Sequence, residues 1–104
     1  MTSINTNSTF SALRLDPRDN VATALRDHVA GETSVLADGE MIVLADNLRR
    51  GHKFALTSIA SGGEAIKYGH VIGHALTDIS VGQHVHLHNL EGIAGKAERH
   101  GEKP

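Results

Sequence analysis

The sequence lacks cysteine and tryptophan and has few aromatic residues of any kind. Without cysteine, a disulfide framework, a thiolate zinc site and a cysteine nucleophile are excluded. Aromatic residues make up only 3% of the 104 residues, so a core has to be built from Val, Ile, Leu and Ala. No run of about 18 apolar residues is present, and the polar N-terminus has no apolar signal core, so we expect no membrane association.

An excess of charge of one sign is also missing. Ten basic and 12 acidic residues give a net charge of −2, which leaves no basic field for a phosphate backbone and argues against nucleic-acid binding. We therefore expect a cytoplasmic protein of one domain. The unusual count is eight histidines, whose protonation would reverse the sign of the net charge.

A short pattern, a hydrophobic residue or His followed three positions later by Gly, occurs four times. The copies are His28-Val29-Ala30-Gly31, Leu48-Arg49-Arg50-Gly51, Ile59-Ala60-Ser61-Gly62 and Ile79-Ser80-Val81-Gly82. Their starts are separated by 20, 11 and 20 residues, which is two copies of a pair. This spacing predicts two interlocked β units related by a pseudo-two-fold axis.

Polar residues precede each copy, namely Asp27, Asp46, Ser58 and Asp78. We expect their side chains to cap a single helical or 3₁₀ turn, which the glycine then leaves with a positive φ. Asp38-Gly39 and Tyr68-Gly69 lie between short apolar runs and predict two hairpins. The expected fold is mainly β, with short strands and tight turns in residues 16–92, a flexible N-terminal segment in residues 1–15 and a C-terminal tail in residues 93–104.

The segment His84-Val85-His86-Leu87-His88-Asn89 is the clearest candidate site. As a strand, it would turn Val85 and Leu87 to the core and its three histidines to the other face. Two histidines two residues apart can chelate one metal ion, and the third would then be a second-shell group or a substrate contact. The alternative is a solvated strand face that happens to use histidine.

Two further clusters accompany this segment. In the duplicated pattern, His52 and Lys53 correspond to Gln83 and His84, which suggests that the histidines share one face. Lys67 and Tyr68 could bind an anionic substrate through the ammonium charge and the hydroxyl, although an ordinary exposed lysine is the simpler interpretation of Lys67.

The ordered pieces Gly51-His52-Lys53-Phe54-Ala55-Leu56, Ile66-Lys67-Tyr68-Gly69, Ile72-Gly73-His74-Ala75 and Val85-His86-Leu87-His88-Asn89 resemble a known family. The resemblance is to the SAF domain at the N-terminus of altronate and galactarate dehydratases, which also occurs as the small subunit of two-chain members such as sulfolactate sulfo-lyase. It covers residues 21–90. It implies a β-clip fold, in agreement with the duplicated pattern, and a much larger domain or subunit that completes the active site.

The resemblance also implies a chemistry and a set of residues. It implies loss of water from a sugar acid, or cleavage of sulfolactate, with iron(2+) or another divalent metal in the assembled dehydratase. Carried over by position, the catalytic candidates are His52, His86 and His88, the substrate-binding candidates are Lys53, Lys67, Tyr68 and Asn89, and the metal candidates are His86 and His88. Arg49 and Arg50 make the approach to Gly51 more basic than the family pattern leads us to expect.

Three functions remain open at this point. The chain could be the small subunit of a sugar-acid dehydratase, the small subunit of (2R)-sulfolactate sulfo-lyase, or a stand-alone SAF module that binds without catalysis. The clustered histidines and lysines favour the first two. Because the large domain is missing from this sequence, we expect the isolated chain to be inactive and to self-associate through the face made for its partner.

Overall fold

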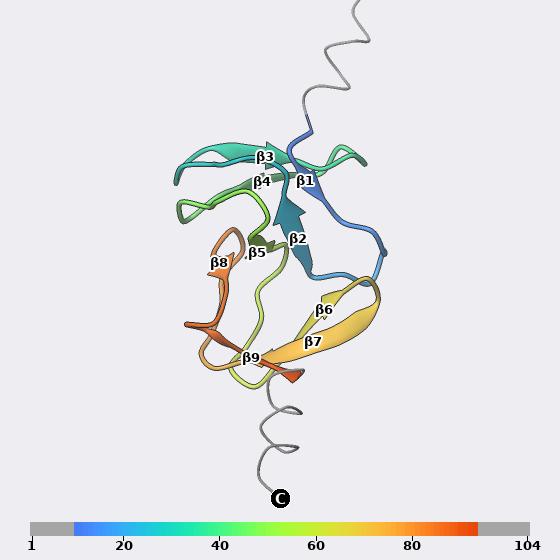
Figure 1. Cartoon of the computed structure of the whole chain (residues 1–104), viewed down its shortest axis with the longest axis vertical. Helices are drawn as coiled ribbons and strands as arrows, with labels where there is room; N and C mark the ends of the chain where they lie inside the picture. The colour runs from blue at the N-terminus through green and yellow to red at the C-terminus, as the bar shows by residue number, and fades with distance from the viewer. Residues whose placement is uncertain (1–9, 94–104) are drawn as a thin grey trace, which may run out of the picture.

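The computed structural model describes residues 10–93 and is mainly β, as predicted. Its strands are β1 (Ala12–Leu13), β2 (Val21–Ala24), β3 (Thr33–Val35), β4 (Met41–Val43), β5 (Lys53–Ala55), β6 (Glu64–Lys67), β7 (His70–Ala75), β8 (His84–Val85) and β9 (Leu90–Gly92). They form a four-stranded sheet in the order β1-β2-β5-β8, the hairpin β3-β4 and a three-stranded sheet in the order β6-β7-β9. Figure 1 shows the four-stranded sheet between the other two, an arrangement that agrees with a β-clip-like SAF domain.

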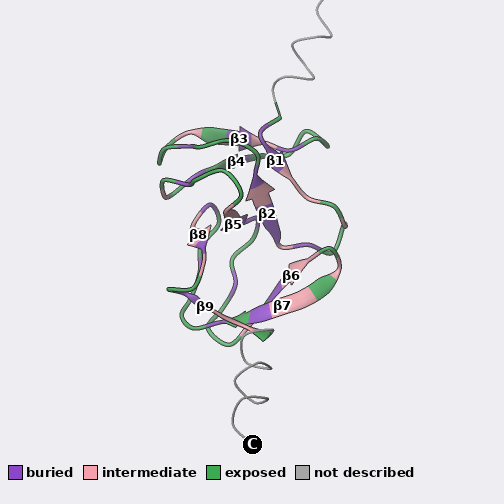
Figure 2. Cartoon of the chain, viewed as in Figure 1, coloured by how far each residue is buried: buried purple, intermediate pink, exposed green. Residues whose placement is uncertain are grey.

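Two hydrophobic cores form because neighbouring residues of the central strands point to opposite faces. In β2, Val21 and Ala22 belong to different cores, and in β5 Ala55 and Phe54 divide in the same way. The first core also contains Ala12, Ala24, Leu36, Ile42, Leu44, Leu48 and Leu56, and the second contains Ile59, Ala65, Ala75, Ile79, Val85 and Leu90. Figure 2 shows buried residues in strands that contribute to both cores, among them β2 and β7. Apart from Phe54 the cores are aliphatic, as the composition predicted.

The four copies of the glycine pattern join in two pairs. We call residues 24–32 with 44–52 the first clasp, and residues 55–63 with 75–83 the second clasp. In the first clasp the backbones of His28 and Leu48 exchange two hydrogen bonds of 2.9 Å, and in the second Ile59 and Ile79 exchange two of 2.8 Å. The glycine N–H groups also bond across each clasp, from Gly31 to Leu44, Gly51 to Ala24, Gly62 to Ala75 and Gly82 to Ala55. The duplication predicted from the spacing is therefore confirmed.

The turns themselves are not the helical or 3₁₀ turns that we expected. In the first copy the N–H of Glu32 donates to the carbonyl of Val29, and Gly31 stands third in this four-residue β-turn with a φ of 93°. A positive φ at the third position is the type II pattern, which glycine adopts without a steric penalty. The other three copies repeat this hydrogen bond and this positive φ.

The polar residues before the turns also act differently from the prediction. Three of the four, Asp27, Asp46 and Asp78, accept from a backbone N–H of a distant segment rather than of their own turn. Asp27 accepts from the N–H of Arg50, Asp78 from that of Ser61 and Asp46 from that of His84, at 2.8 to 2.9 Å. These side chains therefore hold the clasps together from outside.

Both predicted hairpins are present. Asp38-Gly39 connects β3 to β4, and Tyr68-Gly69 connects β6 to β7. In the second hairpin Tyr68 has a φ of 57° and Gly69 a φ of 75°. Two consecutive positive φ values define a type I′ turn, whose twist matches that of the flanking strands.

The fold begins before residue 16, where we expected the flexible segment to end. Ala12 is fully buried in the first core, and β1 pairs with β2. Residues 1–9 and 94–104, which include most of the expected N-terminal segment and C-terminal tail, lie outside the described residues. Within residues 10–93 there is no helix with the length and apolar character needed to cross a membrane.

Candidate functional site

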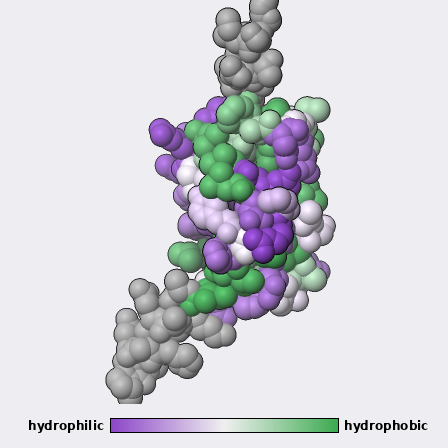
Figure 3. Space-filling model, turned by 90° about the vertical axis from the view of Figure 1, so that its right-hand side faces the viewer, coloured by the Kyte–Doolittle hydropathy of each residue, from purple (hydrophilic) through white to green (hydrophobic). Residues whose placement is uncertain are grey.

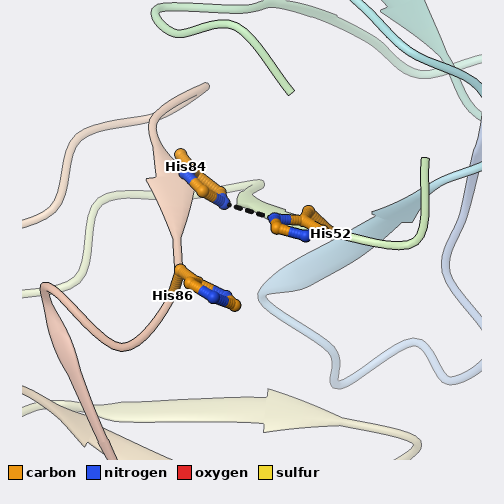
Figure 4. A group of neighbouring side chains, drawn as sticks. All are labelled: His52, His84 and His86. Atoms are coloured by element: carbon orange, nitrogen blue, oxygen red, sulfur yellow. Dashed lines mark hydrogen bonds between the residues drawn. The ribbon is translucent and has the colours of Figure 1, made fainter. Parts of the chain in front are cut away.

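Three histidines converge where the two clasps adjoin. His52 ends the first clasp, His84 lies in β8 directly after the second clasp, and His86 follows β8. One ring nitrogen from each lies within 4.8 Å of those of the other two. Nδ1 of His52 is 2.9 Å from Nε2 of His84, and the ring centroids of His52 and His86 are 4.7 Å apart (Figure 4). The prediction that His52 shares a face with the His84–Asn89 segment is confirmed.

Pairing of β5 with β8 places these rings together. Lys53 pairs with Val85 and Phe54 with His84, which sets the ends of the two strands side by side. Val85 and Phe54 are fully buried, so core packing fixes both strands. The N–H of His84 donates to the carboxylate of Asp46 at 2.9 Å, which ties β8 to the first clasp.

The segment after Val85 is not the strand that we predicted. The N–H of Asn89 donates to the carbonyl of His86 at 3.0 Å, so the chain turns and the strand alternation stops at Val85. As a result Leu87 is 77% exposed instead of facing the core. His88 is also exposed, and its ring lies 5.3 Å from that of His84, outside the group of three.

Asn89 is buried and closes this turn. Its Oδ1 accepts from the N–H of His86 at 2.9 Å, and its Nδ2 donates to the carbonyl of His84 at 2.7 Å. Both polar ends of the amide therefore bind backbone, which orients the two histidines. A direct contact between Asn89 and substrate stays a prediction.

A cavity of about 300 Å³ adjoins the histidines. Its lining residues are Lys53, Lys67, Ile72, His86, Leu87, Leu90 and Gly92. The two ammonium groups and one imidazole are polar groups in an otherwise apolar wall, which is the composition of a small-molecule site with a few orienting groups. Burial, with a smaller effect of the positive charge of Lys67, lowers the pKa of Lys53. This end of the site is therefore suited to an anion.

The remaining candidates take other positions around the cavity. Tyr68 does not line it; the Nζ of Lys67 lies 4.8 Å from the centroid of the Tyr68 ring. His84 lay in the candidate segment but was not assigned a catalytic, substrate-binding or metal role, although its place two residues before His86 was the signal for one. A second hollow of about 470 Å³ lies on the first-clasp side of the histidines and includes Arg49, His52 and His84 in its lining.

The electrostatics favour the neutral form of two of the histidines. Burial lowers the pKa of His84 below the ordinary value of 6.5, and the neighbouring His52, His86 and His88 lower it further. The pKa of His86 is lowered by burial and by His52, Lys53 and His88. Neutral imidazoles have a free ring nitrogen that can bind a metal ion or accept a proton.

The donor set fits a divalent first-row metal. Imidazole nitrogens are good ligands for iron, zinc, nickel and copper, and three protein ligands leave a position for water or substrate. The geometry groups His86 with His52 and His84, whereas the predicted partner His88 is not part of this group. Asp46 and Asn89 bind the backbone N–H groups of His84 and His86, a role that outer contacts have in metal sites.

A mainly β domain built from two clasps, with a histidine cluster and a lysine-lined cavity at their junction, is consistent with a β-clip-like SAF domain. The sequence matches the family described as the altronate/galactarate dehydratase SAF domain over residues 10–92. The chain belongs to this family.

Relatives of this chain include both large and small proteins. It is 51% identical over 92 residues to the altronate dehydratase of Escherichia coli (strain K12), covering 88% of this chain and 18% of that enzyme. The altronate dehydratase of Bacillus subtilis (strain 168) is 47% identical over 81 residues, which is 78% of this chain and 16% of that enzyme. The (2R)-sulfolactate sulfo-lyase subunit alpha of Paracoccus pantotrophus is 42% identical over 59 residues, which is 57% of this chain and 87% of that subunit. The chain therefore spans less than a fifth of the altronate dehydratases that it matches.

Proposed function

We propose that this chain is the SAF component of a hydroxy-acid lyase and binds the carboxylate of a sugar acid of the altronate type. The observation that carries the proposal is that Lys53, Lys67 and His86 line one cavity beside the cluster of three histidines. Two ammonium groups can donate to the two oxygens of one carboxylate. The identity of 51% to an altronate dehydratase supports a sugar acid as the ligand.

Loss of water from such an acid needs a base for the proton next to the carboxylate and assistance for the departing hydroxyl. Lys53 and Lys67 would neutralise the carboxylate, which makes the neighbouring C–H more acidic. His86 lines the same cavity, which places the histidine cluster beside the bound acid, and the base for this proton would come from the larger chain proposed below. When bound by His52, His84 and His86, a divalent ion such as iron(2+) supplies Lewis-acid assistance to the hydroxyl.

We further propose that a much larger chain completes the active site. The chain spans 18% of the Escherichia coli altronate dehydratase, and a relative of comparable size is named as a subunit of a lyase. Leu87 is 77% exposed at the rim of the cavity, where a partner would cover it. The isolated chain is then expected to bind substrate without turning it over.

A second candidate is the alpha subunit of a sulfolactate sulfo-lyase. It is favoured by the 42% identity to such a subunit, of which the match covers 87%. The same pair of lysines could bind the carboxylate of sulfolactate. The remaining chemistry would be expulsion of sulfite rather than water.

Purification of the complex that this chain forms in its native cell tests the proposal. We expect a large protein to co-purify and the complex to dehydrate altronate, with activity reduced by Lys67→Gln and kept by His88→Gln. Sulfite release from sulfolactate without altronate turnover would favour the second candidate. A complex with neither activity would contradict both.

A further inference from the structure

Tyr68 stands in a backbone conformation that disfavours tyrosine. Among the described residues it is the one non-glycine residue with a positive φ, and it occupies the first central position of the type I′ turn. Asn, Asp and Gly are the usual residues there, because a larger side chain is strained at positive φ. An Asn-Gly turn would connect β6 and β7 with less strain, so the hairpin alone does not account for a tyrosine.

The surrounding structure holds this turn in place. The carboxylate of Asp19 accepts from the N–H of Gly69 at 2.8 Å. The side chain of Asn20 makes two hydrogen bonds to the backbone of β6. It accepts from the N–H of Ile66 and donates to the carbonyl of Glu64. Figure 3 shows hydrophilic side chains gathered in the middle of this side of the molecule, where the loop of residues 14–20 meets the hairpin in Figure 1. Strained conformations persist where neighbouring contacts impose them in this way.

The tyrosine ring contacts one of the two lysines of the cavity. The Nζ of Lys67 lies 4.8 Å from the centroid of the Tyr68 ring, within the range of a cation–π interaction. Lys67 shares the cavity lining with Lys53, whose positive charge repels it. The negative face of the ring offsets this repulsion and limits where the ammonium group of Lys67 can lie.

We propose that Tyr68 is a positioning residue, whose ring holds the Lys67 ammonium at the cavity in readiness for a carboxylate. The inference rests on the proposed function of the cavity. It assigns the aromatic face of Tyr68, and not its hydroxyl, to the site. It also explains why a strained residue stands where Asn would fit better, because Asn offers no face to the ammonium.

Nuclear magnetic resonance of the unchanged chain and two variants, titrated with D-altronate, tests this role. A ring next to the ammonium shifts the Hε resonances of Lys67 upfield. Tyr68→Phe should keep this shift and the altronate affinity. Tyr68→Asn should lose the shift, raise the melting temperature by relieving the turn, and weaken altronate binding by about two- to fivefold.

Three outcomes would overturn the inference. Tyr68→Asn could lose the shift and still bind altronate as tightly as the unchanged chain, so that the contact would have no role in binding. Tyr68→Phe could weaken binding as much as Tyr68→Asn, which would assign the hydroxyl to the ligand. If altronate causes no shift at Lys53, Lys67 or His86 in the unchanged chain, the proposed function fails, and the role of Tyr68 fails with it before any variant is compared.

Discussion

Nδ1 of His52 lies 2.9 Å from Nε2 of His84, although 32 residues separate them in the sequence. His52 ends the first clasp and His84 follows the second, so the bond joins the two halves of the duplicated fold. One ring donates and the other accepts when both are neutral. A metal ion would replace the shared proton at this position, so the hydrogen bond and a bound metal ion exclude each other.

Removal of one histidine of the cluster should reduce metal affinity. His84→Gln leaves two imidazoles, and we expect the affinity of the isolated chain for Co²⁺ or Fe²⁺ to fall by more than about tenfold. Competition with a chromogenic chelator measures this. His88→Gln is the matched control, because His88 lies outside the group of three. A loss of affinity in His88→Gln with none in His84→Gln would return the metal site to the predicted pair His86 and His88.

The stability of the fold should decrease as the pH falls below about 6.5. The pKa values of His28, His84 and His86 are lowered from 6.5, mainly by burial, so the unfolded chain takes up their protons first. Above about pH 6.5 these groups are neutral in both states and contribute nothing. The carboxyl of Asp16, whose pKa the hydrogen-bonded Arg18 lowers to about 2, titrates below this range.

Urea unfolding at about pH 7.5 and about pH 5.5 measures this effect on either side of the ordinary histidine pKa. The double variant His84→Gln, His86→Gln should lose part of the pH dependence. A free energy of unfolding that is the same at both pH values would contradict the assignment.

Val85 and Leu87 should respond differently to the same substitution. Val85 is fully buried, and Val85→Ala should destabilise the fold by about 1 to 3 kcal/mol through lost burial and a cavity. Leu87 is 77% exposed, and Leu87→Ala should change the free energy of unfolding by no more than about 0.5 kcal/mol. Chemical denaturation measures the free energy of unfolding of both variants. A similar loss of stability in the two would favour the strand through residue 89 that the sequence predicted.

The pseudo-symmetric capping positions of the second clasp offer another matched pair. Asp78→Ala removes the acceptor for the N–H of Ser61 and should cost about 0.5 to 1.5 kcal/mol. Ser58 occupies the equivalent position on the other side of the clasp, and its side chain makes no such bond to the described backbone. Thermal melting should therefore show Ser58→Ala to be close to neutral. A larger loss for Ser58→Ala than for Asp78→Ala would contradict the cross-clasp role.

The repeated pattern allowed much of this fold to be predicted. Glycine spacing indicated the duplication, and the duplication in turn brought His52 to the histidine segment. The hydrogen-bond donor to each capping residue was not predictable in the same way. The local sequence around Asp27 is compatible with a bond to its own turn and with a bond to the turn that begins 20 residues later. The bond from the N–H of Arg50 to Asp27 forms because the two turns of the first clasp pair in the folded chain.

The exposed Leu87 was missed for a similar reason. Alternation from His84 to His88 is a valid strand pattern, but the buried amide of Asn89 binds the backbone of His84 and His86 and bends the chain. A side chain that competes with strand pairing in this way leaves no periodic signal. The turn that Asn89 closes is therefore seen only in the structure, where His88 lies outside the group of three histidines.

Because the cluster joins His52 of the first clasp to His84 and His86, which follow the second clasp, binding of a metal ion there would be thermodynamically coupled to docking of these two segments. A metal ion at about 100 times its dissociation constant adds about 2.7 kcal/mol to the folded state. That free energy acts only when His52 is held against His84 and His86, and therefore opposes separation of β5 from β8. Amide hydrogens of β5 and β8 should exchange more slowly with metal present, while those of the distant β3–β4 hairpin turn should exchange at an unchanged rate.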